Sequence, residues 1–269
     1  MSIPDAPPDQ IQTPSLPPYS ILSPLTETSP ELAPARRLLE EYSSIAPEDV
    51  DAHMQAIRTE AHRISHYGAY NSLSFLNLSP ALHDPRFQTI AALLRSNSSS
   101  TFLDVGCGLG LILRQLTFSG IHSSRLYGTD LNADLLDLGF DLFRDRDTSH
   151  TTFIAGDMLD DSDTPLNETL NGKMDYIYAS AFFHLFEREG QVNAAKRMVG
   201  FLKEGGAGVI FGVNGGPKIE GWERYVLDEE QWREAWDEVG NATGTRWRTE
   251  MEVESGEDWI WVRFGVYRV

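Results

Sequence analysis

The chain has 269 residues, 41% of them hydrophobic, which suits one α/β domain of ordinary size with an attached helical segment. Its formal net charge of −18, without a basic cluster, argues against a nucleic acid or an anionic membrane surface as its partner. No apolar run can cross a bilayer, no secretory signal is visible, and Cys107 is the only cysteine, so we expect a cytoplasmic protein without disulfides.

The first hundred residues predict an arm followed by helices. Residues 1–30 are rich in Pro, Ser and Thr, which is typical of a flexible arm. A helix is expected to begin at Pro47, because Val50, Met54 and Ile57 follow at steps of three and four residues. The aromatic stretch "HYGAYNSLSFLNL" comes next, and "DPRFQTIAALLRS" predicts another short helix. We therefore expect residues 31–98 to form a helical N-terminal cap.

From Thr101 the pattern changes to strands that alternate with helices. The expected strands cover residues 101–105, 125–130, 151–156, 175–180 and 207–213. Such alternation predicts βαβ units and a parallel sheet. After a helix that carries Trp232 and Trp236, two strands follow in succession and predict an antiparallel pair. Residues 99–269 are therefore expected to form the core domain.

A glycine turn, "LDVGCGLG", follows the first of these strands. Gly106, Gly108 and Gly110 let the backbone approach a ligand closely at the N-terminus of the next helix. A phosphate, a dinucleotide or a sulfonium cofactor would suit such a turn. The spacing departs from the dinucleotide fingerprint, and the carboxylate of Asp104 would repel a pyrophosphate but attract an ammonium group.

Acidic residues also follow the next two strands. Asp130 ends the second strand, where a carboxylate accepts hydrogen bonds from ribose hydroxyls, as in sites for NAD and for S-adenosylmethionine. Asp157 follows the third strand, where it suits the amino group of adenine, with Met158 against the ring. The three acids and the glycine turn together resemble a class I S-adenosylmethionine-dependent methyltransferase.

This resemblance implies a fold, a cofactor and a set of cofactor-binding residues. The fold would be a Rossmann-like sheet of seven strands, mostly parallel with an antiparallel C-terminal strand, and with helices on both faces. The cofactor would be S-adenosylmethionine. The expected cofactor-binding residues are Asp104, Gly106, Cys107, Gly108, Asp130, Leu131, Gly156, Asp157, Met158 and Ser180.

Longer stretches resemble a narrower group. Residues 35–61, 138–148 and 174–203 are similar to fungal small-molecule methyltransferases of meroterpenoid and related polyketide–terpenoid pathways. The resemblance implies an O-methyltransferase of secondary metabolism with a hydrophobic substrate. That group includes enzymes that methylate a carboxylic acid of a farnesylated aromatic-polyketide intermediate, so a methyl ester is the expected product, whereas other members are assigned only as O-methyltransferases of secondary metabolism. Methylation of a phenol, hydroxyl or amine is the alternative, and a non-catalytic methyltransferase-like regulatory subunit is another.

The acceptor decides what the site needs. A carboxylic acid is ionised near neutrality and needs no base, whereas a phenol does. His184 follows the fourth strand, so it is the candidate catalytic residue, as a base for a phenol or as an orienting donor for a carboxylate. Methyl transfer is a single displacement, and we expect no metal. The expected substrate-binding residues are Tyr67, Tyr70, Phe75, Phe183, His184 and Trp222.

Overall fold

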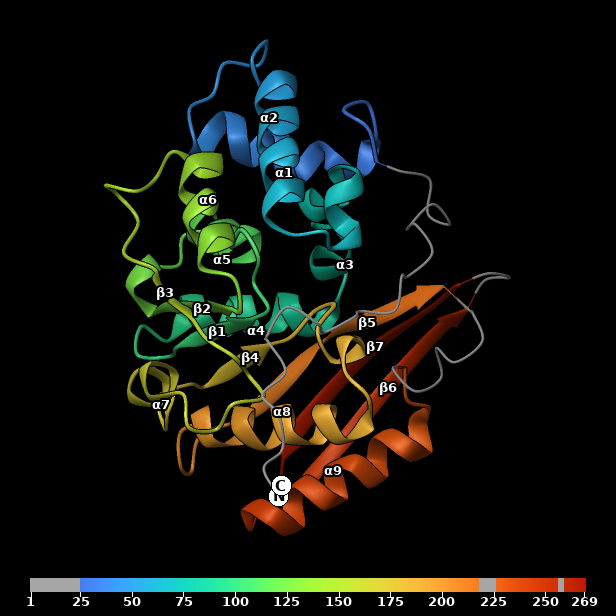
Figure 1. The fold of residues 1–269 in the computed structure, drawn as a ribbon. Coiled ribbons are helices and arrows are strands. Elements are labelled where there is room, and N and C mark those ends of the chain that lie inside the picture. The colour runs from blue at the N-terminus through green and yellow to red at the C-terminus, as the bar shows by residue number, and fades with distance from the viewer. Residues whose placement is uncertain (1–24, 218–225, 256–258) are drawn as a thin grey trace, which may run out of the picture.

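A mixed sheet of seven strands, in the order β3-β2-β1-β4-β5-β7-β6, forms the centre of the molecule (Figure 1). It is seen in a computed structural model that describes residues 25–217, 226–255 and 259–269. The strands are β1 (Phe102–Val105), β2 (Leu126–Asp130), β3 (Thr152–Ala155), β4 (Tyr176–Tyr178), β5 (Val209–Pro217), β6 (Trp247–Ser255) and β7 (Trp259–Arg268).

The pairing of the strands confirms the predicted mostly parallel sheet. Strands β1 to β5 pair in parallel, whereas β7 runs antiparallel between β5 and β6. Strand β5 continues to Pro217, past the expected end at Val213, because its pairing with β7 continues to Trp259. Strand β4 ends early, at Tyr178, and the chain soon turns through Ala181, whose φ is +51°.

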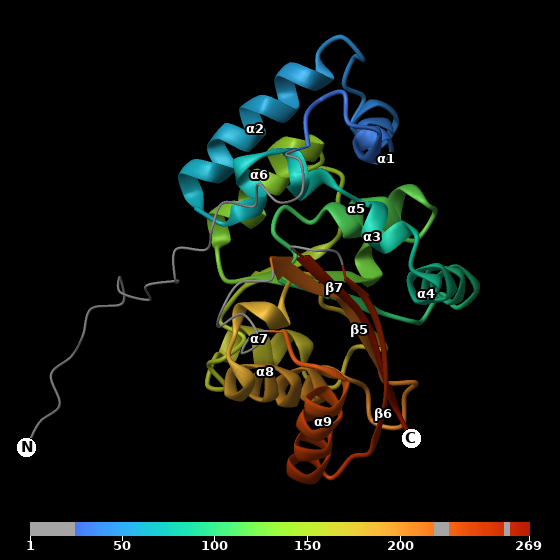
Figure 2. The same cartoon turned by 90° about the vertical axis from the view of Figure 1, so that its right-hand side faces the viewer.

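Helices cover both faces of the sheet, as predicted (Figures 1 and 2). One face carries α4 (Pro85–Ser96), α5 (Leu111–Phe118) and α6 (Ala133–Phe143), and the other carries α7 (Thr164–Leu170), α8 (Arg188–Phe201) and α9 (Glu229–Thr243). Alternate strand residues point to opposite faces. Phe102 and Tyr178 therefore pack in the cluster below α4 and α5, whereas Leu103 and Ile177 pack against α8.

The N-terminal segment packs on the outside of α5 and α6 as a helical cap (Figure 2). Its elements are η1 (Pro30–Leu32), α1 (Ala33–Arg37), the π-helix η2 (Leu38–Tyr42), α2 (Val50–Ile64), η3 (Gly68–Asn71), η4 (Leu73–Leu76) and α3 (Ser79–Leu82). Two short 3-10 helices lie further along the chain, η5 (Ser123–Arg125) and η6 (Phe183–Leu185). Met54 and Ile57 share one buried cluster with Leu138 and Leu142 of α6. The cap and the sheet domain are therefore joined by a common apolar core.

A buried ion pair joins α5, the segment after α6 and the cap. Arg114 on α5 is 1% exposed, and its Nε and Nη2 donate to the two carboxylate oxygens of Asp145 at 2.9 and 3.1 Å. Its Nη1 donates to the carbonyl of Leu109 in the glycine turn at 3.1 Å. From the cap, the hydroxyl of Tyr42 donates to Asp145 Oδ2 at 2.8 Å. The ion pair thus connects the glycine turn, α5, the segment after α6 and the cap.

Removal of one partner would leave the other charge buried and unpaired. We expect Asp145→Asn to lower the free energy of unfolding by about 3–5 kcal/mol, the range typical of a broken buried pair. Urea unfolding followed by circular dichroism measures this loss. The matched control is Arg146→Gln, which removes an exposed pair with Asp137 and should hardly move the midpoint. Equal losses in the two variants would contradict the role given to Arg114.

Candidate active site

The glycine turn between β1 and α5 has the left-handed backbone that its glycines permit. Gly106, Gly108 and Gly110 have φ values of +70°, +52° and +71°. The N–H groups of Gly106 and Cys107 both donate to the carbonyl of Thr129 on β2, at 2.8 and 3.0 Å. A Cβ on Gly110 would lie 2.3 Å from Arg114 Nη1, so the buried guanidinium requires glycine there. The turn is therefore fixed by β2 on one side and by Arg114 of α5 on the other.

Asp104 is a carboxylate without a partner. Its side chain is 4% exposed, and no described residue donates a hydrogen bond to it. Burial raises its pKa well above the ordinary value, and the nearby Asp130 raises it further. A buried carboxylate in this state gains from a cationic ligand, because a positive charge beside it favours the ionised form. Asp104 therefore fits a group such as the α-ammonium of S-adenosylmethionine.

Asp130 is held at the end of β2 with its carboxylate facing the turn. Its Oδ2 accepts the N–H of Gly108 at 2.9 Å, and its Oδ1 accepts the N–H of Asn132 at 3.1 Å. Burial raises the pKa of Asp130, although these backbone donors act in the opposite direction. A carboxylate oxygen can accept more than one hydrogen bond, so both oxygens keep capacity for hydroxyl donors. This arrangement fits a ribose.

The end of β3 lies beside the end of β2, since the N–H of Gly156 donates to the carbonyl of Asp130 at 3.0 Å. Asp157 is exposed, and its Oδ1 accepts the N–H of Leu159 at 2.8 Å. Met158 is buried in the core, whereas Leu131 is 70% exposed beside Asp130. An apolar side chain exposed next to the acid is available to a planar ring. The residues expected around adenine are thus brought to one end of the sheet.

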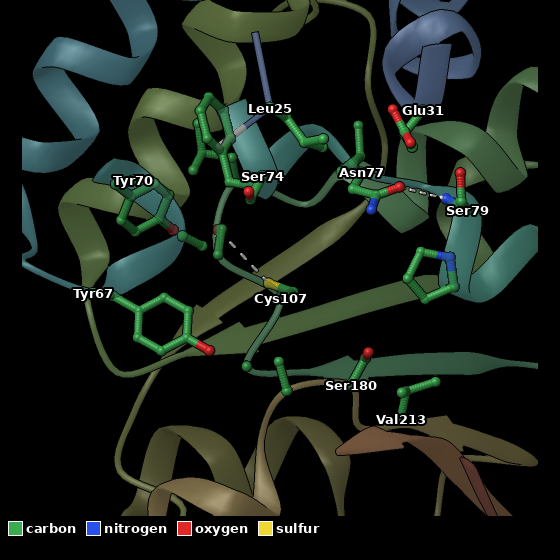
Figure 3. A pocket seen from close by; sticks show the side chains of 18 of the residues that line it. Leu25, Glu31, Tyr67, Tyr70, Ser74, Asn77, Ser79, Cys107, Ser180 and Val213 are labelled. Atoms are coloured by element: carbon green, nitrogen blue, oxygen red, sulfur yellow. Dashed lines mark hydrogen bonds between the residues drawn. The ribbon is translucent and has the colours of Figure 1, made fainter. Parts of the chain in front are cut away.

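A cavity of about 730 Å³ lies between the cap and the sheet (Figure 3). Tyr67, Tyr70 and Phe75 line it from the cap, and Ser180 lines it from the end of β4. The hydroxyls of Tyr67 and Ser180 point toward its centre in Figure 3, where Cys107 of the glycine turn also lies. The walls further include Gly106, Gly108, Leu109, Leu111, Leu142 and Val213. The predicted residues that line this cavity are Tyr67, Tyr70, Phe75, Gly106, Cys107, Gly108 and Ser180. Asp104, Asp130 and His184 are not among its lining residues.

The tyrosines of the cap lie directly over the glycine turn. A Cβ added to Gly108 would lie 3.0 Å from the hydroxyl of Tyr70, and the ring of Tyr70 packs against Tyr67 and Phe75. Burial and the charge of Asp130 raise the pKa of Tyr70, which therefore stays neutral at physiological pH. The cap forms the aromatic side of the cavity and closes it beside the turn.

His184 lies just behind this aromatic wall. It is 3% exposed, and burial lowers its pKa to about 4, so the imidazole is neutral near pH 7. Its Nδ1 accepts the backbone N–H of Gly215 at 3.4 Å, which places the ring proton on Nε2. Nε2 lies 3.5 Å from the hydroxyl of Tyr67, a residue that lines the cavity. His184 is therefore arranged as a neutral hydrogen-bond donor.

The remaining candidate residues are Phe183, Trp222 and Cys107. Phe183 is fully buried and packs edge to face against Trp232 and Phe264, outside the cavity wall, because η6 turns it toward α9. Phe183 does not line the cavity in this arrangement of η6, and its contact with substrate stays a prediction. Trp222 lies outside the described residues. Burial and the charge of Asp104 raise the pKa of the Cys107 thiol, which leaves it protonated and unreactive.

Sequence reasoning missed a third wall of the cavity. It comes from the C-terminal hairpin and includes Glu254, Trp261 and Arg263. Trp261 and Arg263 are two positions apart on β7, so their side chains share one face of the strand. That alternation in "WIWVRF" was the available signal, but the sequence does not indicate which face of the hairpin meets the cavity.

The described residues offer no membrane span and no metal centre. No helix among them is long and apolar enough to cross a bilayer. His62 and His66 are four residues apart on and after α2, and their rings pack edge to face at 5.2 Å. No third side chain joins them, since no group of three potential metal ligands occurs in this part of the chain.

Two family models match the chain. The model described as "Meroterpenoid methyltransferase N-terminal domain" matches residues 22–76, which include most of the cap. The model described as "Methyltransferase domain" matches residues 102–206, from β1 through α8. The first model therefore covers most of the helical cap, and the second covers the part of the chain that contains the glycine turn.

Curated relatives and solved structures agree with these matches. The chain is 39% identical to the O-methyltransferase phiE of Fungal sp. (strain ATCC 74256), over 87% of this chain and 79% of that protein. It is 35% identical to the asnovolin E/chermesin D methyltransferase nvfJ of Aspergillus novofumigatus, over 79% and 78% of the two chains.

A magnesium protoporphyrin IX methyltransferase from Synechocystis with bound S-adenosylmethionine has the same fold, with a TM-score of 0.50 and 13% identity over 80% of this chain and 97% of that one. The chain therefore belongs to the S-adenosylmethionine-dependent methyltransferases of fungal secondary metabolism that carry the meroterpenoid methyltransferase N-terminal domain.

Proposed function

We propose that this enzyme methylates a carboxylic acid on a hydrophobic intermediate of fungal meroterpenoid biosynthesis and releases a methyl ester. The observation that carries the proposal is the neutral, buried His184, whose Nδ1 already accepts the N–H of Gly215. Such an imidazole donates a hydrogen bond to an anion but is a poor base. A carboxylate acceptor needs a hydrogen-bond donor and does not need a base.

The cofactor seat is proposed at the ends of β1, β2 and β3. The carboxylate of Asp104 receives the α-ammonium group, and Asp130 accepts the ribose hydroxyls. Gly106, Cys107 and Gly108 give the cofactor close access to the backbone, and Ser180 lines the same cavity from the end of the neighbouring strand β4. The remaining cofactor residues surround the adenine: Leu131, Gly156, Asp157 and Met158. When bound, S-adenosylmethionine supplies an electrophilic methyl group on its sulfonium.

The acceptor is proposed to lie in the chamber below the cap. Tyr67, Tyr70 and Phe75 form its aromatic wall and exclude water from the acid. When the carboxylate attacks the methyl carbon, a negative and a positive charge disappear together, so a dry and apolar chamber favours the reaction. The hydroxyl of Tyr67 orients the acid, and the Nε2–H of His184 behind it positions that hydroxyl. This arrangement supplies proximity and in-line geometry.

A phenol acceptor is the second candidate, and the geometry disfavours it. A phenol has a pKa near 10 and needs a base whose pKa lies close to the working pH. The imidazole of His184 has a pKa of about 4 and presents its N–H, not its lone pair, toward Tyr67. No proton acceptor of suitable strength is therefore offered at this position.

The role of Asp130 is tested by cofactor affinity. We expect Asp130→Asn to weaken S-adenosylmethionine binding by about 10- to 100-fold, because charge-assisted hydrogen bonds to the ribose are lost. Isothermal titration calorimetry measures the dissociation constant. Asp137→Asn, an exposed acid on α6, is the matched control and should leave it unchanged. Unchanged affinity in Asp130→Asn would exclude the ribose contact.

The role of Asp104 is tested by pH. Burial and the charge of Asp130 raise the pKa of Asp104 in the free protein, and a bound cation lowers it because a positive charge favours the ionised form. Cofactor binding should therefore release a proton, and affinity should rise with pH. Calorimetry in buffers of different ionisation enthalpy detects this proton. The Asp104→Asn variant should bind the cofactor more weakly and release fewer protons on binding. Equal proton release in the native protein and the variant would contradict the assignment.

The acceptor is tested with a farnesylated dihydroxybenzoic acid, which offers a carboxylate and phenols in one molecule. We expect a base-labile methyl ester and a kcat that is constant between about pH 6 and 8, since neither the acid nor His184 titrates there. His184→Asn, which keeps an N–H donor, should retain much of the rate. Mass spectrometry identifies the product. A methyl aryl ether formed at a rate that rises with pH would contradict the proposal.

A further inference from the structure

The C-terminal hairpin gives the cavity a wall of a different character from the aromatic cap. Trp261 and Arg263 line it from β7, and Glu254 lines it from β6, opposite Trp261 in the register. The ring of Trp261 lies over Gly215, where an added Cβ would be 2.5 Å from a ring carbon. Gly215 is the residue whose N–H donates to His184. This wall therefore adjoins the backbone that orients the imidazole.

Arg263 also lies near the proposed acceptor site in the sheet. It is opposite Val213 on β5, and the carbonyl of Val213 accepts the N–H of Ala181 at 2.7 Å. Two strand spacings thus separate its backbone from Ala181, which is about 10 Å. Val213, Ala181 and Ser180 line the cavity together with Arg263. Arg263 therefore lines the same cavity in which the substrate's carboxylate is proposed to bind.

Among the described residues that line the cavity, Arg263 is the only Lys or Arg, whereas Glu31 and Glu254 are both acidic. Its Nη1 donates to Glu254 Oε1 at 2.6 Å, and its side chain is 25% exposed. The side chain of Glu254 is 54% exposed, so water can solvate this carboxylate when the guanidinium leaves it. The ion pair can therefore be exchanged at small cost.

The protein as a whole opposes an anionic substrate, because its net charge is −18. The neutral His184 offers a hydrogen bond but no charge. A guanidinium that is satisfied by a solvent-accessible partner in the free enzyme provides both charge and two parallel donors for a carboxylate.

We propose that Arg263 determines the specificity for an anionic substrate, by exchanging Glu254 for the substrate's carboxylate while Trp261 packs against the adjoining ring. This inference rests on the proposed carboxyl methylation for its choice of ligand. Arg263 is then a substrate-binding residue that does not contact the methyl donor. Glu254 then acts as a competitor, which keeps the guanidinium paired until an acid replaces it.

The test compares binding of a farnesylated dihydroxybenzoic acid with binding of its primary amide, both in the presence of S-adenosylhomocysteine. We expect the enzyme to bind the acid about tenfold or more tightly than the amide. Arg263→Gln should abolish that difference and leave amide binding unchanged, and Arg263→Lys should restore part of it. Cofactor affinity should not change. An equal loss for acid and amide in Arg263→Gln would overturn the proposal.

Glu254→Gln provides a test that misfolding cannot imitate. Removal of the competing carboxylate should tighten acid binding severalfold and leave amide binding unchanged. Arg248→Gln is the matched control, because Arg248 forms an ion pair with Glu250 on the same hairpin away from the cavity. Weaker acid binding in Glu254→Gln, or an equal change in Arg248→Gln, would contradict the proposal.

These binding measurements involve no turnover, so they separate the two proposals. If the enzyme transfers methyl to a phenol and yet binds the acid through Arg263, the proposed acceptor is wrong and the charge selection stands. If it forms the methyl ester but Arg263→Gln binds acid and amide as the native enzyme does, the charge selection is wrong and the acceptor stands.

Discussion

The buried pair between Arg114 and Asp145 is the constraint on which the cofactor seat depends. A guanidinium without solvent access must satisfy its donors inside the protein, and Arg114 does so through Asp145 and the carbonyl of Leu109. Three aromatic rings, those of Phe140, Phe143 and Phe153, surround it at 4.6 to 5.1 Å. Tyr42 of the cap donates to the same aspartate. The cap is therefore connected to the glycine turn through Asp145 and Arg114. Cofactor seat and substrate chamber are therefore one unit.

Charge distinguishes the proposed cofactor seat from the proposed acceptor chamber. Asp104 is buried close to Asp130, and burial and the charge of Asp130 both raise the cost of ionising Asp104. A cationic cofactor relieves this cost, which explains why such a turn favours a sulfonium ligand over a pyrophosphate. In the proposed acceptor chamber the cap wall is apolar and aromatic, the imidazole of His184 behind it is neutral, and Arg263 and Glu254 form an ion pair on the hairpin wall. This chamber favours a reaction in which two opposite charges meet and vanish.

The sequence allowed the sheet and the position of the strand-end acids at one edge of it to be predicted, because both depend on local pattern. Alternating strands and helices imply parallel order, and the acids at Asp104, Asp130 and Asp157 follow strands whose ends meet at one edge. The substrate end depends on tertiary placement. Whether Phe183 points into the cavity or the core is decided by how η6 packs on α9. The contribution of Arg263 requires the register of β7 on β5, which no local pattern specifies.

The most direct test of this account is a crystal structure of the enzyme with S-adenosylhomocysteine. The account predicts the α-ammonium within hydrogen-bonding distance of Asp104, the ribose on Asp130, and the sulfur open to the chamber lined by Tyr67 and Ser180. A sulfur that faces away from this chamber, or an ammonium held by a residue other than Asp104, would contradict it.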